Sequence, residues 1–153
     1  GLVAGIYTTN NPGQCKYIAE HSKMQIVLVE NKKQLDKFVK IKDELNDLKA
    51  IVIWDKSVTK DDELIIELNK KGNTKILTWN EFMDMGVSND EMNDEIKKRQ
   101  DIIKPGHCCL LIYTSGTTGP PKAVMISHDS LVWTASGIWN QVKTIKRTGE
   151  HSM

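Results

Sequence analysis

The sequence predicts an α/β fold: a largely parallel sheet with helices on both faces, and a hairpin whose loop is rich in glycine, serine and threonine. Short apolar runs alternate with longer stretches of helical periodicity, which is typical of strand–helix–strand units in a parallel sheet. Late in the chain an apolar run breaks into glycine and hydroxyl residues, and a second apolar run follows soon after. At 153 residues, one domain with one core is expected.

Six apolar runs are expected to form strands. Those around Ile26, Ile51 and Ile76 are apolar on both faces, so each is expected to be covered on both sides, as in a parallel sheet between helices. The expected strands are residues 4–7, 24–29, 50–54, 76–79, 108–113 and 123–126.

Capping signals place the helices between these strands. Asn11 before Pro12 suits a helix start, because asparagine can cap and proline is tolerated at the first helical position. His21 is expected at the end of that helix. The next helices are expected from the Asn31/Gln34 capping box to about residue 48, from Thr59 to Gly72, from Asn80 to Gly86, and from the Ser88/Glu91 capping box to about residue 103.

The last helix follows a junction of three polar residues. Ser127 or Asp129 is expected to cap it, and His128 is interpreted as a junction histidine that hydrogen-bonds to backbone, in preference to a group that orients the loop. Residues 148–153 carry no structural pattern and are expected to form a frayed tail.

Composition excludes several classes of protein. Twenty-one basic against 20 acidic residues give a net charge of +1, and these charges are spread out, so nucleic acid is not an expected partner. No apolar stretch approaches the roughly 18–20 residues of a transmembrane helix, and a cytoplasmic protein that binds small molecules is expected. The three cysteines are expected to be reduced and buried, and the spacing of His107-Cys108-Cys109 fits no metal site.

The glycine-rich stretch has the chemistry of a phosphate-binding loop. Its glycines let a ligand approach the main-chain N–H groups, its hydroxyls add donors, and a lysine supplies positive charge. From composition alone, an ordinary polar turn is an equally good interpretation. The P-loop of nucleotide triphosphatases does not fit, because the glycines are too close together and no serine or threonine follows the lysine. The candidate phosphate-binding residues are Thr114, Ser115, Gly116, Thr117, Thr118, Gly119 and Lys122.

The same stretch resembles the AMP-binding signature of the acyl-adenylate-forming superfamily. Residues 112–119, followed by Pro121-Lys122 and residues 125–129, are most similar to the bubblegum type of long-chain acyl-CoA synthetase, and the similarity extends back to Gly5. One position departs from the pattern, because Ala123 stands where the family usually has glycine.

The resemblance implies an enzyme that joins a long-chain fatty acid to ATP, releases pyrophosphate, and transfers the acyl group to coenzyme A. The phosphate-loop hairpin would hold the ATP phosphates with Mg²⁺. Family members are several times longer, so residues 1–147 are interpreted as part of the N-terminal AMP-binding domain, with no catalytic residue or metal ligand in this segment and no activity of its own. Peripheral membrane association, at the endoplasmic reticulum, is compatible with the resemblance. The alternative is a stand-alone nucleotide-binding or protein-interaction module.

Overall fold

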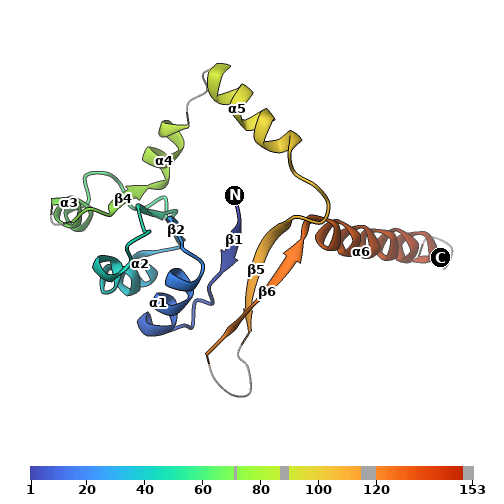
Figure 1. Ribbon diagram of the computed structural model, residues 1–153, viewed down its shortest axis with the longest axis horizontal. Coiled ribbons are helices and arrows are strands. Elements are labelled where there is room, and N and C mark those ends of the chain that lie inside the picture. Colours follow the sequence, from blue (N-terminus) through green and yellow to red (C-terminus); the bar gives the residue numbers. More distant parts are fainter. Residues whose placement is uncertain (71, 87–89, 115–119, 150–153) are drawn as a thin grey trace. The chain divides into compact units, whose positions relative to one another are not determined.

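A computed structural model describes residues 1–70, 72–86, 90–114 and 120–149. The chain divides into two compact units (Figure 1). We call Ile6–Asn93 the N-terminal module, and Gly1–Gly5 together with Asp94–Met153 the hairpin module. No helix in the described part of the chain is long and apolar enough to cross a membrane.

The N-terminal module is built on a parallel sheet of three strands in the order β2-β3-β4. These strands are β2 (Ile26–Val29), β3 (Ala50–Ile53) and β4 (Lys75–Thr78), in register from Ile26 opposite Ala50 and from Ala50 opposite Lys75. The predicted strands and their parallel pairing are confirmed here. The helices of this module are α1 (Pro12–His21), α2 (Lys32–Val39), a 3₁₀ turn η1 (Lys42–Glu44), α3 (Glu63–Lys70) and α4 (Trp79–Met85).

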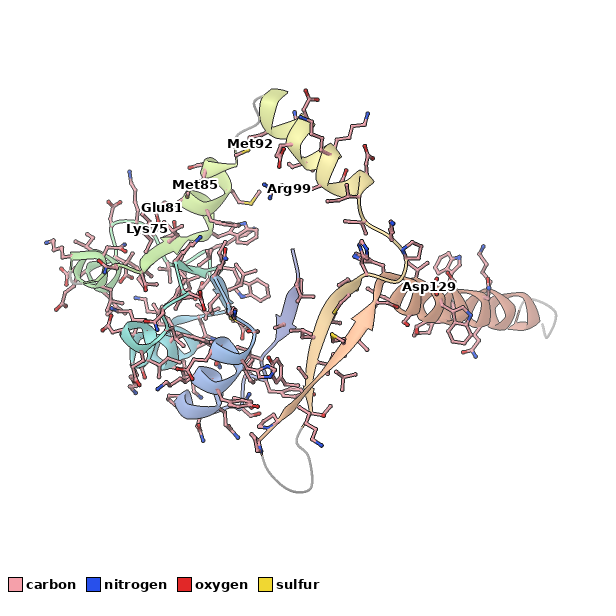
Figure 2. The ribbon with its side chains drawn as sticks, in the orientation of Figure 1. Lys75, Glu81, Met85, Met92, Arg99 and Asp129 are labelled. Atoms are coloured by element: carbon pink, nitrogen blue, oxygen red, sulfur yellow. The ribbon has the colours of Figure 1, made fainter. Side chains whose placement is uncertain are left out.

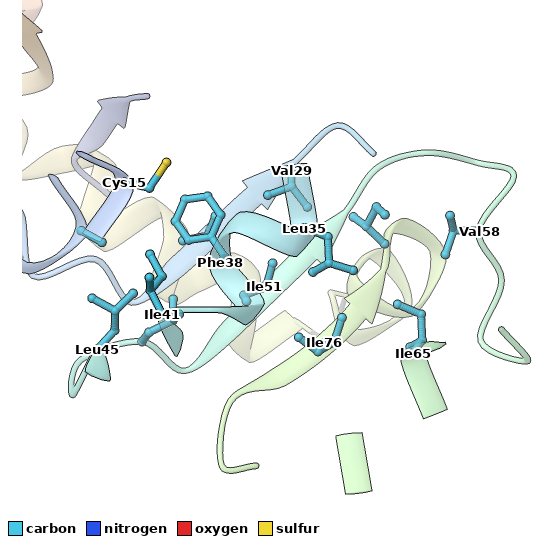
Figure 3. Packing of buried hydrophobic residues seen from close by; sticks show 14 residues of the cluster. Cys15, Val29, Leu35, Phe38, Ile41, Leu45, Ile51, Val58, Ile65 and Ile76 are labelled. Carbon is cyan, nitrogen blue, oxygen red and sulfur yellow. The ribbon is translucent and has the colours of Figure 1, made fainter. Parts of the chain in front are cut away.

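The hydrophobic core lies on one face of this sheet (Figure 3). Alternate residues of β2 and β3 meet side chains of the helices there. The members are Cys15, Ala19, Val27, Val29, Leu35, Phe38, Ile41, Leu45, Leu48, Ile51, Ile53, Val58, Ile65 and Ile76.

On the opposite face of the sheet, some strand side chains are buried and others are exposed. Val52 of β3 is fully buried, whereas Ile26 and Leu28 of the edge strand β2 are 48% and 55% exposed. The expectation of cover on both faces is therefore right for β3, partly right for β4, whose Leu77 is half-buried, and wrong for β2; helix α4 contacts β3 and β4.

Two helix starts share the sequence pattern Asn-x-x-Gln, but only one forms a complete capping box. At α1 the Asn11 side chain accepts from the Gln14 N–H and the Gln14 side chain accepts from the Asn11 N–H, both at 2.9 Å. At α2 the Asn31 side chain accepts from the Gln34 N–H at 3.1 Å, while the Gln34 amide donates to the Thr8 carbonyl at 3.4 Å. The predicted box is thus half present at α2.

Several helix boundaries differ from those predicted. The helix after Asn31 ends at Val39. Ile41 and Leu45, which flank η1, are nevertheless buried. The helix expected from Thr59 begins at Glu63, where Asp62 accepts from the Leu64 N–H at 3.2 Å. After α2, apolar residues thus reach the core without continuous helix.

The start of α4 carries a capping box that was not predicted from sequence. Thr78 accepts from the Glu81 N–H at 3.3 Å, and the Glu81 carboxylate accepts from the Thr78 N–H at 2.9 Å. The end of α4 at Gly86 is as predicted. The predicted Ser88/Glu91 box lies outside the described residues and side chains.

The hairpin module contains a mixed sheet in the order β1-β5-β6. Strand β1 (Val3–Gly5) is parallel to β5 (Cys108–Thr114), and β6 (Lys122–Ser127) is antiparallel to β5. The fold therefore has one parallel and one mixed sheet, in place of a single largely parallel one.

Two helices complete the chain. Helix α5 (Asp90–Asp101) spans the boundary between the two units, and α6 (His128–Gly149) follows β6. Met92 and Arg99 lie on α5 and Asp129 lies at the start of α6 (Figure 2). Helix α6 includes Thr148 and Gly149, which were expected in the frayed tail; the rest of that tail lies outside the described residues.

All three cysteines are free. Cys15 is buried, and burial raises the pKa of its thiol. Cys108 and Cys109 are only half-buried, which corrects the prediction that all three are buried. The register shifts between Cys108 and Leu110, so Cys109 is the extra residue of a β-bulge.

Candidate functional site

The candidate site is built on the β5–β6 strand pair. Apolar residues occupy β5 from Cys108 to Tyr113, which suits a pleated, partly buried strand. The antiparallel register runs without interruption from Leu110 opposite Ile126 to Thr114 opposite Lys122. The two strands therefore hold both ends of the intervening segment at one end of the sheet.

Thr114 and Lys122 are brought together by this register. Residues directly opposite in an antiparallel pair point to the same face, with Cβ atoms about 4.5–5.5 Å apart. Both side chains are exposed. Two side chains that carry a hydroxyl donor and an ammonium group thus begin side by side where the strands end, and both could contact a phosphate group.

The other five predicted phosphate-binding residues are not placed. Ser115, Gly116, Thr117, Thr118 and Gly119 lie outside the described residues. Their role stays a prediction.

The far end of β6 is fixed by hydrogen bonds at the start of α6. Ser127 accepts from the Ser130 N–H at 3.2 Å, which makes Ser127, of the two predicted candidates, the residue whose side chain caps the helix. The His128 N–H donates to the His107 carbonyl at 3.0 Å and the Asp129 N–H to the Pro105 carbonyl at 2.9 Å. The main chain of His128 is therefore held at the junction, and the hydrogen bond expected of its imidazole stays a prediction.

His128 and Lys122 lie at opposite ends of the β6 segment, because β6 runs from Lys122 to Ser127 and α6 begins at His128. This placement argues against a direct role of His128 in orienting the loop.

Tyr113 is a residue of this site that was read from sequence only as part of a strand. Its side chain is 3% exposed, directly before Thr114 and directly opposite Ala123. The signal in the sequence was an aromatic residue that closes an aliphatic run at the edge of the glycine-rich stretch.

Perturbed carboxylates occur in the N-terminal module. A hydrogen bond from Lys32, at 2.5 Å, is the main cause that lowers the pKa of Asp62, and hydrogen bonds from Ser57 lower the pKa of Asp55. The Lys32–Asp62 interaction ties α2 to the start of α3, whereas the Ser57–Asp55 hydrogen bonds lie within the loop after β3. Among the described residues, no group of three or more histidine, cysteine, aspartate or glutamate side chains could hold a metal ion.

Residues 1–152 match the family of AMP-binding enzymes. The chain belongs to that family. Long-chain-fatty-acid–CoA ligase ACSBG2 of Xenopus laevis is 42% identical over 149 residues, which are 97% of this chain and 18% of that protein. The ligase ACSBG1 of Homo sapiens is 41% identical over 135 residues, which are 88% of this chain and 17% of that protein. The resemblance to bubblegum-type synthetases is confirmed.

This AMP-binding family member spans about a fifth of the length of its curated relatives; for human ACSBG2 the share is 20%, at 39% identity over 99% of the chain. Two solved structures show the same fold. The anthranilate CoA ligase AuaEII in complex with anthranoyl-AMP aligns with a TM-score of 0.51 at 20% identity, over 83% of this chain and 20% of that one. The A domain of carboxylic acid reductase from Segniliparus rugosus, in complex with AMP and a co-purified carboxylic acid, aligns with a TM-score of 0.52 at 18% identity, over 82% and 20%.

Proposed function

We propose that the chain is a segment of a long-chain fatty acyl-CoA synthetase, which forms an acyl-adenylate from a fatty acid and ATP and then a thioester with coenzyme A. The observation that carries this proposal is the 42% identity to a long-chain-fatty-acid–CoA ligase over 97% of the chain. Residues outside the segment would supply the adenine site, the acyl site and the catalytic groups. Peripheral association with the endoplasmic reticulum is part of the same proposal.

The segment's contribution is to hold the ATP phosphates. Thr114 and Lys122 would contact the β and γ phosphates from the two strand ends, and the residues between them would add N–H and hydroxyl donors. Lys122 would offset negative charge as pyrophosphate departs, which is an electrostatic contribution from a group fixed in advance. Mg²⁺ would accompany the phosphates, and coenzyme A would bind outside this segment.

Substitution of Lys122 tests this role. In the intact synthetase, Lys122→Ala is expected to lower the rate of ATP–pyrophosphate exchange by roughly 10²–10³-fold, as for the loss of one electrostatic contact in the transition state. Lys104→Ala is the matched control, because Lys104 is an exposed lysine in the turn before β5. An unchanged exchange rate in folded Lys122→Ala would exclude Lys122 from phosphate binding.

The isolated chain is expected to make no acyl-CoA. It carries the phosphate contacts, but the groups that fix adenine and activate the carboxylate are assigned to the rest of the synthetase. Incubation of the purified 153-residue protein with palmitate, ATP, Mg²⁺ and coenzyme A, followed by thioester analysis, measures this directly. Thioester above the level of a protein-free control would refute the segment interpretation.

A further inference from the structure

In the hairpin module, burial is concentrated beside the candidate site. The described side chains of this module are exposed or half-buried, with two exceptions: Leu111 is 9% exposed and Tyr113 is 3% exposed. Two residues apart on one strand, they point to the same face of β5. Ile112, between them on the opposite face, is 39% exposed.

At Tyr113 the described sheet has two paired strands instead of three. Strand β1 pairs with β5 as far as Gly5 opposite Ile112. Beyond that point, among the described strands, β5 pairs with β6 alone. From Tyr113 to Thr114, β5 is therefore stabilised by its hydrogen bonds to β6 and by the burial of the Tyr113 side chain.

The residue opposite Tyr113 is small. Ala123 is its cross-strand partner, so the side chain directly opposite the phenol ring is a single methyl group. The next pair along the ladder is Thr114 opposite Lys122. Any movement of the Tyr113/Ala123 pair would therefore be passed on directly to the two side chains at the strand ends.

We propose that Tyr113 is a positioning residue for Thr114 and Lys122. The small side chain of Ala123, directly opposite, leaves room for the Tyr113 ring. This inference rests on the proposed phosphate-binding function. A displacement of about 1 Å in a positioned group can cost roughly a hundredfold in function. A large buried side chain next to the strand ends restricts that displacement, because its ring cannot shift without opening a cavity.

The test measures binding of radiolabelled inorganic triphosphate to the full chain by equilibrium dialysis, a method that does not require a monomer. Tyr113→Ala is expected to raise the Kd about tenfold, within the range for a misplaced group. Tyr113→Phe keeps the ring and is expected to change the Kd by less than about threefold. Ile112→Ala is the matched control on the opposite face, and its effect should stay within about twofold.

A double-mutant cycle separates positioning from a general loss of stability. If Tyr113 acts through Lys122, Tyr113→Ala adds almost nothing to the loss already caused by Lys122→Ala. If the two losses multiply, Tyr113 acts independently of Lys122 and the inference is overturned. It is equally overturned if Lys122→Ala weakens binding while folded Tyr113→Ala binds as tightly as the wild type.

Two further outcomes are decisive. If circular dichroism shows that Tyr113→Ala is unfolded, Ala123→Val replaces it, because valine suits a strand while its extra methyl groups crowd the ring. Weaker triphosphate binding by folded Ala123→Val supports the inference, and unchanged binding refutes it. If the wild type does not bind triphosphate, or Lys122→Ala binds as well as the wild type, the proposed phosphate-binding function fails and the inference fails with it.

Discussion

Lys42 is buried although lysine side chains are usually exposed. Its side chain is 6% exposed, and its Nζ donates to Asp43 Oδ1 at 2.6 Å. Gly72 lies against the same group: a Cβ added there would come within 2.6 Å of Lys42 Nζ. Gly72 was predicted to close a helix. The structure adds a reason for glycine at this position, which is the space that the buried ammonium group needs.

Gly72→Ala is therefore expected to destabilise the chain through Lys42. Because Nζ is the end of a flexible side chain, we expect a modest cost of about 1 kcal/mol, at the low end for overpacking. In a Lys42→Met background, which removes the ammonium group and keeps the aliphatic stem, the same substitution should cost almost nothing. Urea denaturation of the four proteins measures both values. Equal costs in the two backgrounds would show that Lys42 is not the reason for the glycine.

At the scale of elements, the two Asn-x-x-Gln starts are a natural comparison. Asn11→Ala is expected to destabilise the chain by about 1 kcal/mol, as for loss of an N-cap. Gln14→Ala should cost about 0.5 kcal/mol, the low end for one hydrogen bond. Gln34→Ala should cost less than Gln14→Ala, because Gln34 makes only a 3.4 Å contact to Thr8. Chemical denaturation gives the ranking, and a larger loss for Gln34→Ala would contradict the assignment of the boxes.

Helix α6 carries large apolar side chains that are exposed. Its described side chains beyond the first turn are exposed, including Trp133 at 77% and Trp139 at 59%. Lys143 lies over the Trp139 ring, with its Nζ 5.5 Å from the ring centroid. A helix with several large apolar side chains normally packs them against another element.

At the scale of the whole molecule, exposed apolar side chains should dominate the behaviour of the isolated chain. The examples include Leu28, Met125, Val132, Trp133 and Trp139. Exposed apolar patches promote association. We expect the 153-residue protein to bind a hydrophobic dye and to form oligomers, measured by dye fluorescence and light scattering. A monodisperse monomer with one cooperative thermal transition would favour the alternative of an independent module.

Local sequence patterns predicted the order of strands and helices, the parallel pairing of β2, β3 and β4, and the antiparallel pairing of β5 with β6. These features follow from local patterns: apolar runs, caps and glycine-rich breaks act within a few residues of one another. The family assignment also followed from local residues, those on either side of the 115–119 segment and within it. Lys122 and Thr114 were named from the same local pattern, and their role in phosphate binding stays a prediction.

Which side-chain hydrogen bonds form, and which side chains are buried, became clear from the three-dimensional structure alone. Gln34 completes a capping box in its sequence pattern, yet it contacts Thr8 of a distant segment. The burial of side chains differed from strand to strand, and the proposed roles of Gly72 and Tyr113 rest on their neighbours Lys42 and Ala123. Local patterns specify backbone conformation, whereas burial and cross-strand partners are set by contacts between residues far apart in the chain, which periodicity does not encode.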